Sequence, residues 1–129
     1  MMKQALLSRL EAFEIDAPGA AAPFSRKLAA EQNWPLHYTK RVIQEYRRVL
    51  FLAVTSDGVM SPSPAVDAAW HMHLTHTRSY WGQLCGEVLG RELHHDPSMG
   101  GLAESKRYQQ YYRDTLTLYT VEFVEPPPA

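Results

Sequence analysis

Histidines gather in one part of this chain in a way that suggests metal chemistry. Five of the six histidines fall between positions 71 and 95. Asp67 precedes His71 by four positions, which is about one helical turn. Imidazole titrates near neutral pH and is the commonest protein ligand for transition metals. The pattern therefore predicts a single functional site in this region.

Helical geometry restricts which of these histidines can act together. Successive residues of an α-helix turn by about 100°, so residues two positions apart point in nearly opposite directions. In a regular helix His71 and His73 cannot hold the same ion. A helix interrupted near Leu74-Thr75 would remove this restriction and let the two imidazoles converge.

One possible arrangement combines a helix with the loop that follows it. Asp67 and His71 would act as a pair, and His95 or His94 would fold back from the loop to join them. Asp67 would then be either a metal ligand or the carboxylate that orients an imidazole.

The other arrangement pairs His73 with His76, three positions apart on one helix face.

We expect one site for a divalent transition metal, zinc or iron. Its expected ligands are His71, His73, His95 and Asp67, with His94 and His76 as alternatives. The residues expected to surround these ligands are Trp70, Tyr80 and Cys85.

Two interpretations without a metal stay open. In the first, the Trp/His cluster is a structural polar core, and the chain is an interaction module that docks a neighbouring domain or a protein partner. In the second, the chain is a histidine enzyme that uses a nearby hydroxyl of Thr75, Thr77 or Ser79. The His-Glu-x-x-His signature of metallohydrolases is absent, so the sequence does not decide whether the protein is an enzyme.

Composition limits the class of protein. The chain has 129 residues, 45% of them hydrophobic and 21% charged, as expected for one globular domain. Its formal net charge of -1 argues against nucleic-acid binding. No apolar run approaches the roughly 20 residues of a membrane span, and the single cysteine cannot form an internal disulfide. We therefore expect a cytoplasmic protein.

Apolar residues at helical spacing predict a compact all-α bundle of about five helices. The expected helices lie around 6–13, from 25 to 32, from 35 past 53, from 64 to 89, and around 108–119. Ser25 and Ser63 are the expected N-caps, and Pro35 and Pro64 the expected first helical residues. A loop is expected over 91–101 and a short extended segment over 121–124. Residues 1–124 would form a single helical domain, followed by a Pro-rich tail over 125–129.

Several of these segments together resemble a known family. Val66-Asp67-Ala68-Ala69-Trp70-His71-Met72-His73 forms a Val-Asp-x-x-Trp-His-x-His motif. Further matching segments are 41–48, 77–81, 84–86, 88–95 and 100–101. The chain resembles the short bacterial form of the glycine-rich domain-containing protein-like family over roughly residues 33 to 128, with 33–124 in the helical domain.

The resemblance implies a helical domain that is often part of longer proteins, and it implies no settled reaction. It also implies a set of signature residues here, namely Asp67, Trp70, His71, His73 and His95. The chain departs from the family in having only seven glycines and no glycine-rich tract, so functions tied to that tract are not carried over. His76 lies outside the signature, which favours the loop histidine as the third member of the site.

Overall fold

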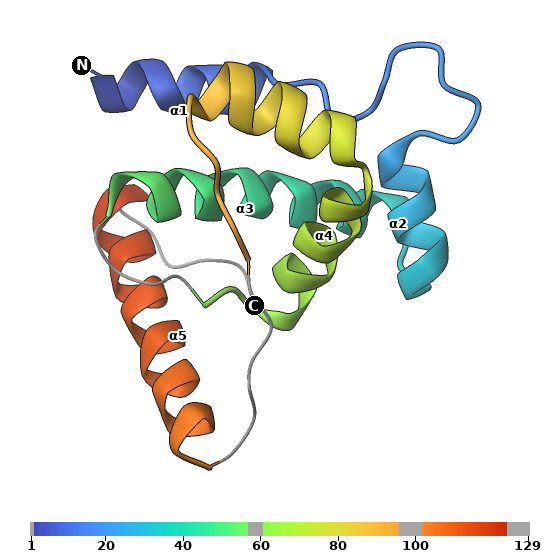
Figure 1. Ribbon diagram of the computed structural model, residues 1–129. Helices are drawn as coiled ribbons and strands as arrows, with labels where there is room; N and C mark the ends of the chain where they lie inside the picture. The colour runs from blue at the N-terminus through green and yellow to red at the C-terminus, as the bar shows by residue number, and fades with distance from the viewer. Residues whose placement is uncertain (1, 57–60, 96–101, 124–129) are drawn as a thin grey trace.

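The central element of the fold is helix α3 (Leu36–Thr55), against which four other helices pack (Figure 1). The computed structural model describes residues 2–56, 61–95 and 102–123, and these ranges contain helices and connecting segments but no strand. The predicted all-α class is confirmed. The other helices are α1 (Met2–Ala12), α2 (Phe24–Gln32), α4 (Pro64–Thr75), η1 (Arg78–Leu89) and α5 (Leu102–Phe123). The Pro-rich tail expected over 125–129 lies outside the described residues.

The core is built around the apolar stripe of α3. Val42, Ile43, Tyr46, Val49 and Leu50 repeat at helical spacing, and all five are buried. Removing such a side chain from water contributes about 1.5–3 kcal/mol to folding. The apolar periodicity that predicted this helix therefore also identified the face it buries.

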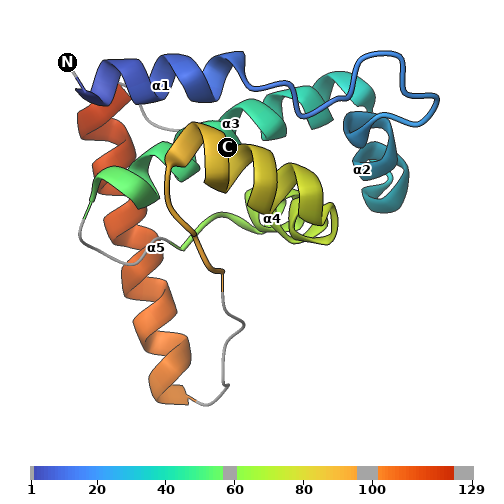
Figure 2. The ribbon, with the colours of Figure 1, turned by 45° about the horizontal axis from the view of Figure 1, so that its top comes forward.

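The predicted helix over 64–89 is divided in two, which gives six helices in the described residues instead of five. α4 ends where His76 leaves helical geometry, at φ -90° and ψ 72°, and η1 then begins with π-type hydrogen bonding. A straight helix of this length would extend about 39 Å, well beyond the roughly 30 Å of α3. The bend returns the second half over the core, where η1 lies beside α1 and buries Leu84 and Cys85 (Figure 2).

The helix starts agree with the sequence in part. Ser63 accepts a hydrogen bond from the Val66 amide at 3.3 Å and Pro64 is the first residue of α4, as predicted. Pro35 lies one position before α3 instead of being its first residue. Ser25 is not a cap, because α2 already begins at Phe24.

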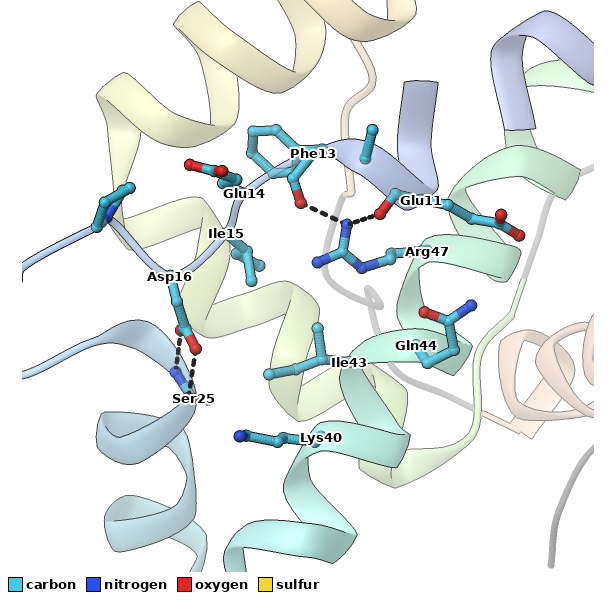
Figure 3. Close-up of a pocket in the computed structure, with 12 residues that line it drawn as sticks. Glu11, Phe13, Glu14, Ile15, Asp16, Ser25, Lys40, Ile43, Gln44 and Arg47 are labelled. Carbon is cyan, nitrogen blue, oxygen red and sulfur yellow. Dashed lines mark hydrogen bonds between the residues drawn. The ribbon is translucent and has the colours of Figure 1, made fainter. Parts of the chain in front are cut away.

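The connection between α1 and α2 is held at both of its ends (Figure 3). The Arg47 guanidinium donates to the carbonyls of Leu10, at 2.6 Å, and Phe13, where α1 ends. The Asp16 carboxylate accepts from the Ser25 amide at 2.7 Å and from its hydroxyl at 2.6 Å. Asp16 thus performs the capping role predicted for Ser25, from nine positions earlier in the chain.

The end of α5 also differs from the prediction. Residues 121–123, expected to be extended, continue the helix to Phe123, and residue 124 lies outside the described residues. The Phe123 ring contacts Phe51, with centroids 6.1 Å apart, and lies 4.7 Å from the Arg48 guanidinium carbon. These contacts with α3 favour continuation of the helix. Among the helices described, none is long and apolar enough to cross a membrane.

Candidate metal centre

The first part of the site lies on α4, away from the core. Asp67 and His71 are one turn apart on this helix, and His71 Nε2 is 3.5 Å from Asp67 Oδ2. The His71 side chain is 59% exposed and the Asp67 side chain 35% exposed. Both groups are therefore accessible to an ion or a small ligand from solvent.

The second part comes from the segment after η1. His95 Nε2 donates to Asp67 Oδ1 at 2.6 Å, across 28 positions of sequence. The His95 ring stacks on Trp70, with centroids 4.1 Å apart and planes 9° apart, and its side chain is only 15% exposed. The His71 and His95 rings have centroids 5.1 Å apart. The structure thus places Asp67, His71 and His95 together, as in the first of the two arrangements that the sequence allows.

A chain of hydrogen bonds holds the segment that carries His95. Trp70 Nε1 donates to the Tyr80 hydroxyl at 2.9 Å, and this hydroxyl donates to the Leu93 carbonyl. Burial raises the pKa of the Cys85 thiol, and a hydrogen bond between this thiol and the Leu93 backbone partly offsets that rise. Trp70, Tyr80 and Cys85 therefore lie behind the His95 segment and fix its position.

The three groups are close enough to share one ion. One ligand atom from each of Asp67, His71 and His95 lies within 4.8 Å of the others. Ligands bound at about 2.1 Å to one ion are separated by roughly 3–4 Å, so only small side-chain rotations are needed. The hydrogen bond from His95 lowers the pKa of the Asp67 carboxyl, burial opposes this, and the positive potential of His71 and His95 adds to it. Asp67 is thus held in the anionic form that binds metal.

His73 lies on the opposite side of α4, apart from this cluster. It is fully buried, with Nδ1 2.7 Å from the Tyr46 hydroxyl and Nε2 2.8 Å from Ser79 Oγ. Four aromatic rings surround the imidazole, those of Phe13, Phe24, Tyr46 and Tyr80. The helix break follows both His71 and His73, so it does not bring them together. The expected grouping of His73 with the other ligands is therefore not what the structure shows.

The environment of His73 favours a neutral ring. Burial lowers the pKa of His73 to about 3, and His76 and Arg47 add to this effect through their charge. Burial also raises the pKa of Tyr46 well above its ordinary value, so the phenol keeps its proton. Both ring nitrogens of His73 are engaged within the protein, which leaves neither free for a metal.

The two alternative ligands also lie outside the cluster. His94 is 63% exposed, 3.7 Å from a Glu92 oxygen, and its ring packs against Trp81. His76 ends α4 and donates from Nδ1 to the Met72 carbonyl at 3.0 Å. His94 therefore has different surroundings from the adjacent His95, and His76 has different surroundings from His73, three positions before it.

Sequence reasoning did not assign Tyr46 a role beside the histidines. Tyr46 is 27 positions from His73 and lies within the apolar stripe of α3, where helical spacing alone indicates a core residue. A buried phenol needs a hydrogen-bond partner, and this was the signal that could have linked it to the histidines. The sequence offers Ser79 as a possible nucleophile, and the structure shows it half-buried and hydrogen-bonded to His73.

The model of the UCP032817-like family matches residues 22–121 of the chain. The chain belongs to this family. The resemblance to the glycine-rich domain-containing protein-like family was therefore wrong. That resemblance combined the Val-Asp-x-x-Trp-His-x-His motif with further segments over roughly residues 33 to 128, and the family model that matches the chain is a different one. Neither curated proteins nor solved structures gave a match to the chain. α4, η1 and the candidate ligands all lie inside the part that matches the UCP032817-like family.

Proposed function

We propose that Asp67, His71 and His95 bind a divalent transition metal, zinc or iron. The observation that carries this proposal is the convergence of three ligand atoms within 4.8 Å from two separate segments of the chain. Two imidazoles and one carboxylate form a donor set that suits both Zn²⁺ and non-haem Fe²⁺. An ion held by three protein ligands keeps open positions, where it can act as a Lewis acid or activate water.

The surroundings of the three residues support binding of this kind. His95 is held by its stack on Trp70 and by the bonds to Leu93, so little conformational freedom is lost when it binds an ion. The exposed faces of Asp67 and His71 leave room for water or a substrate. His95 donates the Nε2 proton to Asp67, and this proton has to move to Nδ1 or to solvent before Nε2 can bind an ion.

A competing function has one observation in its favour. The 2.6 Å bond between His95 and Asp67 already satisfies both groups without an ion. In this case the cluster is a structural clamp on the segment after η1, and the chain is an interaction module for a neighbouring domain or a protein partner. Metal uptake distinguishes the two functions.

The experiment measures bound metal on the untagged full chain after chelation and reconstitution, by mass spectrometry and titration calorimetry. We expect about one equivalent of Zn²⁺ or Fe²⁺ in the wild type. His95→Ala and Asp67→Asn should each weaken binding at least about 100-fold, because each removes one of three ligands.

His94→Ala is the matched control, since it removes the adjacent and exposed histidine that lies outside the cluster. This variant should bind metal as the wild type does. Less than about a tenth of an equivalent of every transition metal in the folded wild type would overturn the proposal. Equal losses in His94→Ala and His95→Ala would also overturn it.

A further inference from the structure

A second hollow, separate from the metal cluster, is formed by α3, the start of α4 and α5. Its volume is about 670 Å³, within the range of roughly 300–1,000 Å³ found for small-molecule sites. Its walls are mainly apolar and aromatic, and include Tyr38, Val42, Val49, Val66, Tyr112 and Leu116. None of the three candidate metal ligands lines it.

One acidic group in this hollow is already neutralised by the protein. Glu45 accepts a hydrogen bond from the Tyr119 hydroxyl, and its other oxygen lies 4.0 Å from Arg48 Nη1. Arg48 also donates to the Tyr119 hydroxyl at 2.7 Å. Burial, reinforced by the bond to Glu45, raises the pKa of Tyr119 to about 12, so this phenol keeps its proton. Glu45 therefore adds little net negative charge to the wall.

Among the described residues that line the hollow, the remaining charged group is a cation. Arg41 lines the hollow from α3, one turn before Glu45, and its side chain is exposed. It forms no ion pair with any residue that the structure describes. A mainly apolar hollow with one uncompensated guanidinium at its edge complements a molecule with an apolar body and one negative group. A guanidinium can hold a carboxylate through two parallel hydrogen bonds.

We propose that this hollow binds a small amphipathic monocarboxylate, with its carboxylate on Arg41 and its apolar body between α3 and α5. This site goes beyond the proposed metal centre and does not depend on it. The volume is ample for a ligand of on the order of 10–15 non-hydrogen atoms. The tyrosine rings favour an aromatic body over a flexible chain.

The test uses three probes that share a ring system and differ in charge, namely naphthaleneacetate, naphthaleneethanol and naphthaleneethylamine. Binding to the full chain is measured by titration calorimetry in the presence of a chelator, so the metal proposal has no effect on the result. We expect saturable 1:1 binding of the carboxylate, with the alcohol weaker by about tenfold and the amine weaker still.

Two variants separate the role of the charge from that of the hollow. Arg41→Gln should weaken the carboxylate about tenfold and leave the alcohol unchanged, because the side chain is exposed and its loss does not disturb the core. Lys40→Gln, the neighbouring exposed cation that does not line this hollow, is the control and should bind both probes as the wild type does. Leu116→Trp should fill the hollow and abolish binding of both probes.

Metal uptake by Leu116→Trp shows that this variant is folded, and it separates this test from that of the metal centre. If the wild type itself takes up no metal, the circular dichroism spectrum and melting temperature of Leu116→Trp show instead whether the variant is folded. The absence of saturable carboxylate binding to the folded wild type up to millimolar concentration overturns the inference. Equal affinity for all three probes, or a preference for carboxylate that survives Arg41→Gln, also overturns it.

Discussion

The two sides of α4 place histidine in opposite environments. On the outer side, His71 is exposed near the Asp67 carboxylate, which His95 reaches from a distant segment. On the inner side, His73 is fully buried between the Tyr46 and Ser79 hydroxyls. Only two positions separate His71 from His73, and the geometry of the helix sends them to these different environments.

The difference shows that the chemistry of a histidine is decided by its partners and its access to water. The outer group has a carboxylate, two imidazoles and open solvent, which are the conditions for binding a cation. The inner imidazole has two neutral hydroxyl partners and aromatic walls, which favour an uncharged structural ring. A count of histidines in the sequence would give both the same weight.

The largest effect should come from removing the inner histidine. His73→Ala leaves a cavity and deprives the buried Tyr46 hydroxyl of its partner, so the free energy of unfolding should fall by about 3 kcal/mol. His71→Ala, measured in chelator, should cost less than about 0.5 kcal/mol because the side chain is exposed. Urea unfolding followed by circular dichroism measures both values. Similar losses for the two variants would remove the distinction between the two sides.

The next effect should be a loss of stability on acidification, caused by the inner histidine, His73. The pKa of His73 is about 3 in the folded chain and near 6.5 when unfolded, so between these values the unfolded state binds the extra proton. The free energy of unfolding therefore falls as pH decreases from about 6.5 towards 3, and His73 contributes up to about 1.4 kcal/mol per pH unit to that slope. His73→Gln should show a shallower slope in urea unfolding over this range. An unchanged slope would mean that the ring is charged or accessible in the fold.

A smaller effect should follow from loosening the support of the outer cluster. Tyr80→Phe removes the hydroxyl that joins Trp70 to the Leu93 carbonyl. It should cost about 2 kcal/mol, because the buried Trp70 indole and the carbonyl of half-buried Leu93 then lack this partner. It should also weaken metal binding about tenfold, since Leu93 is two positions before His95. Tyr38→Phe is the control, because the Tyr38 hydroxyl makes no hydrogen bond to any described residue. Calorimetric metal titration measures the second effect, and equal affinities in both variants would contradict it.

The smallest effect concerns the outer carboxylate without metal. The folded pKa of Asp67 lies below its ordinary 3.8, so its ionised form adds stability above that pH, and this contribution is lost as pH falls below it. Asp67→Asn in chelator should cost less than about 1 kcal/mol at pH 7, since the group is partly exposed. The difference from wild type should shrink towards pH 3 in thermal unfolding. A difference that grows on acidification would contradict this assignment.

Local rules were sufficient for much of the fold. Apolar spacing identified the buried face of α3, and Ser63-Pro64 fixed the start of α4 through its own hydrogen bond. The turn per residue of a helix also separates His71 from His73, although the predicted site grouped the two. These features depend on residues within one or two helical turns of each other, so they can be predicted from short stretches of sequence.

Features that depend on distant partners were not predictable in the same way. The bend at His76 arises because η1 packs back against α1, and the partnership of His73 with Tyr46 joins residues 27 positions apart. Asp16 replaced Ser25 as the cap of α2 because the chain between them folds back on itself. The choice of His95 over His94 depends on which of two adjacent rings can stack on Trp70.

The first helix has a practical consequence for protein production. The family match starts at residue 22, yet Leu6 and Leu10 of α1 belong to the buried core, and Arg9 donates from α1 to the Val88 carbonyl of η1. Leu10 also offers its carbonyl to Arg47 of α3. A fragment trimmed to the family boundaries would leave an apolar strip open to water and a guanidinium without its acceptors. Truncated versions of this chain should therefore aggregate more readily than the full-length chain, even though every candidate metal ligand is still present in them.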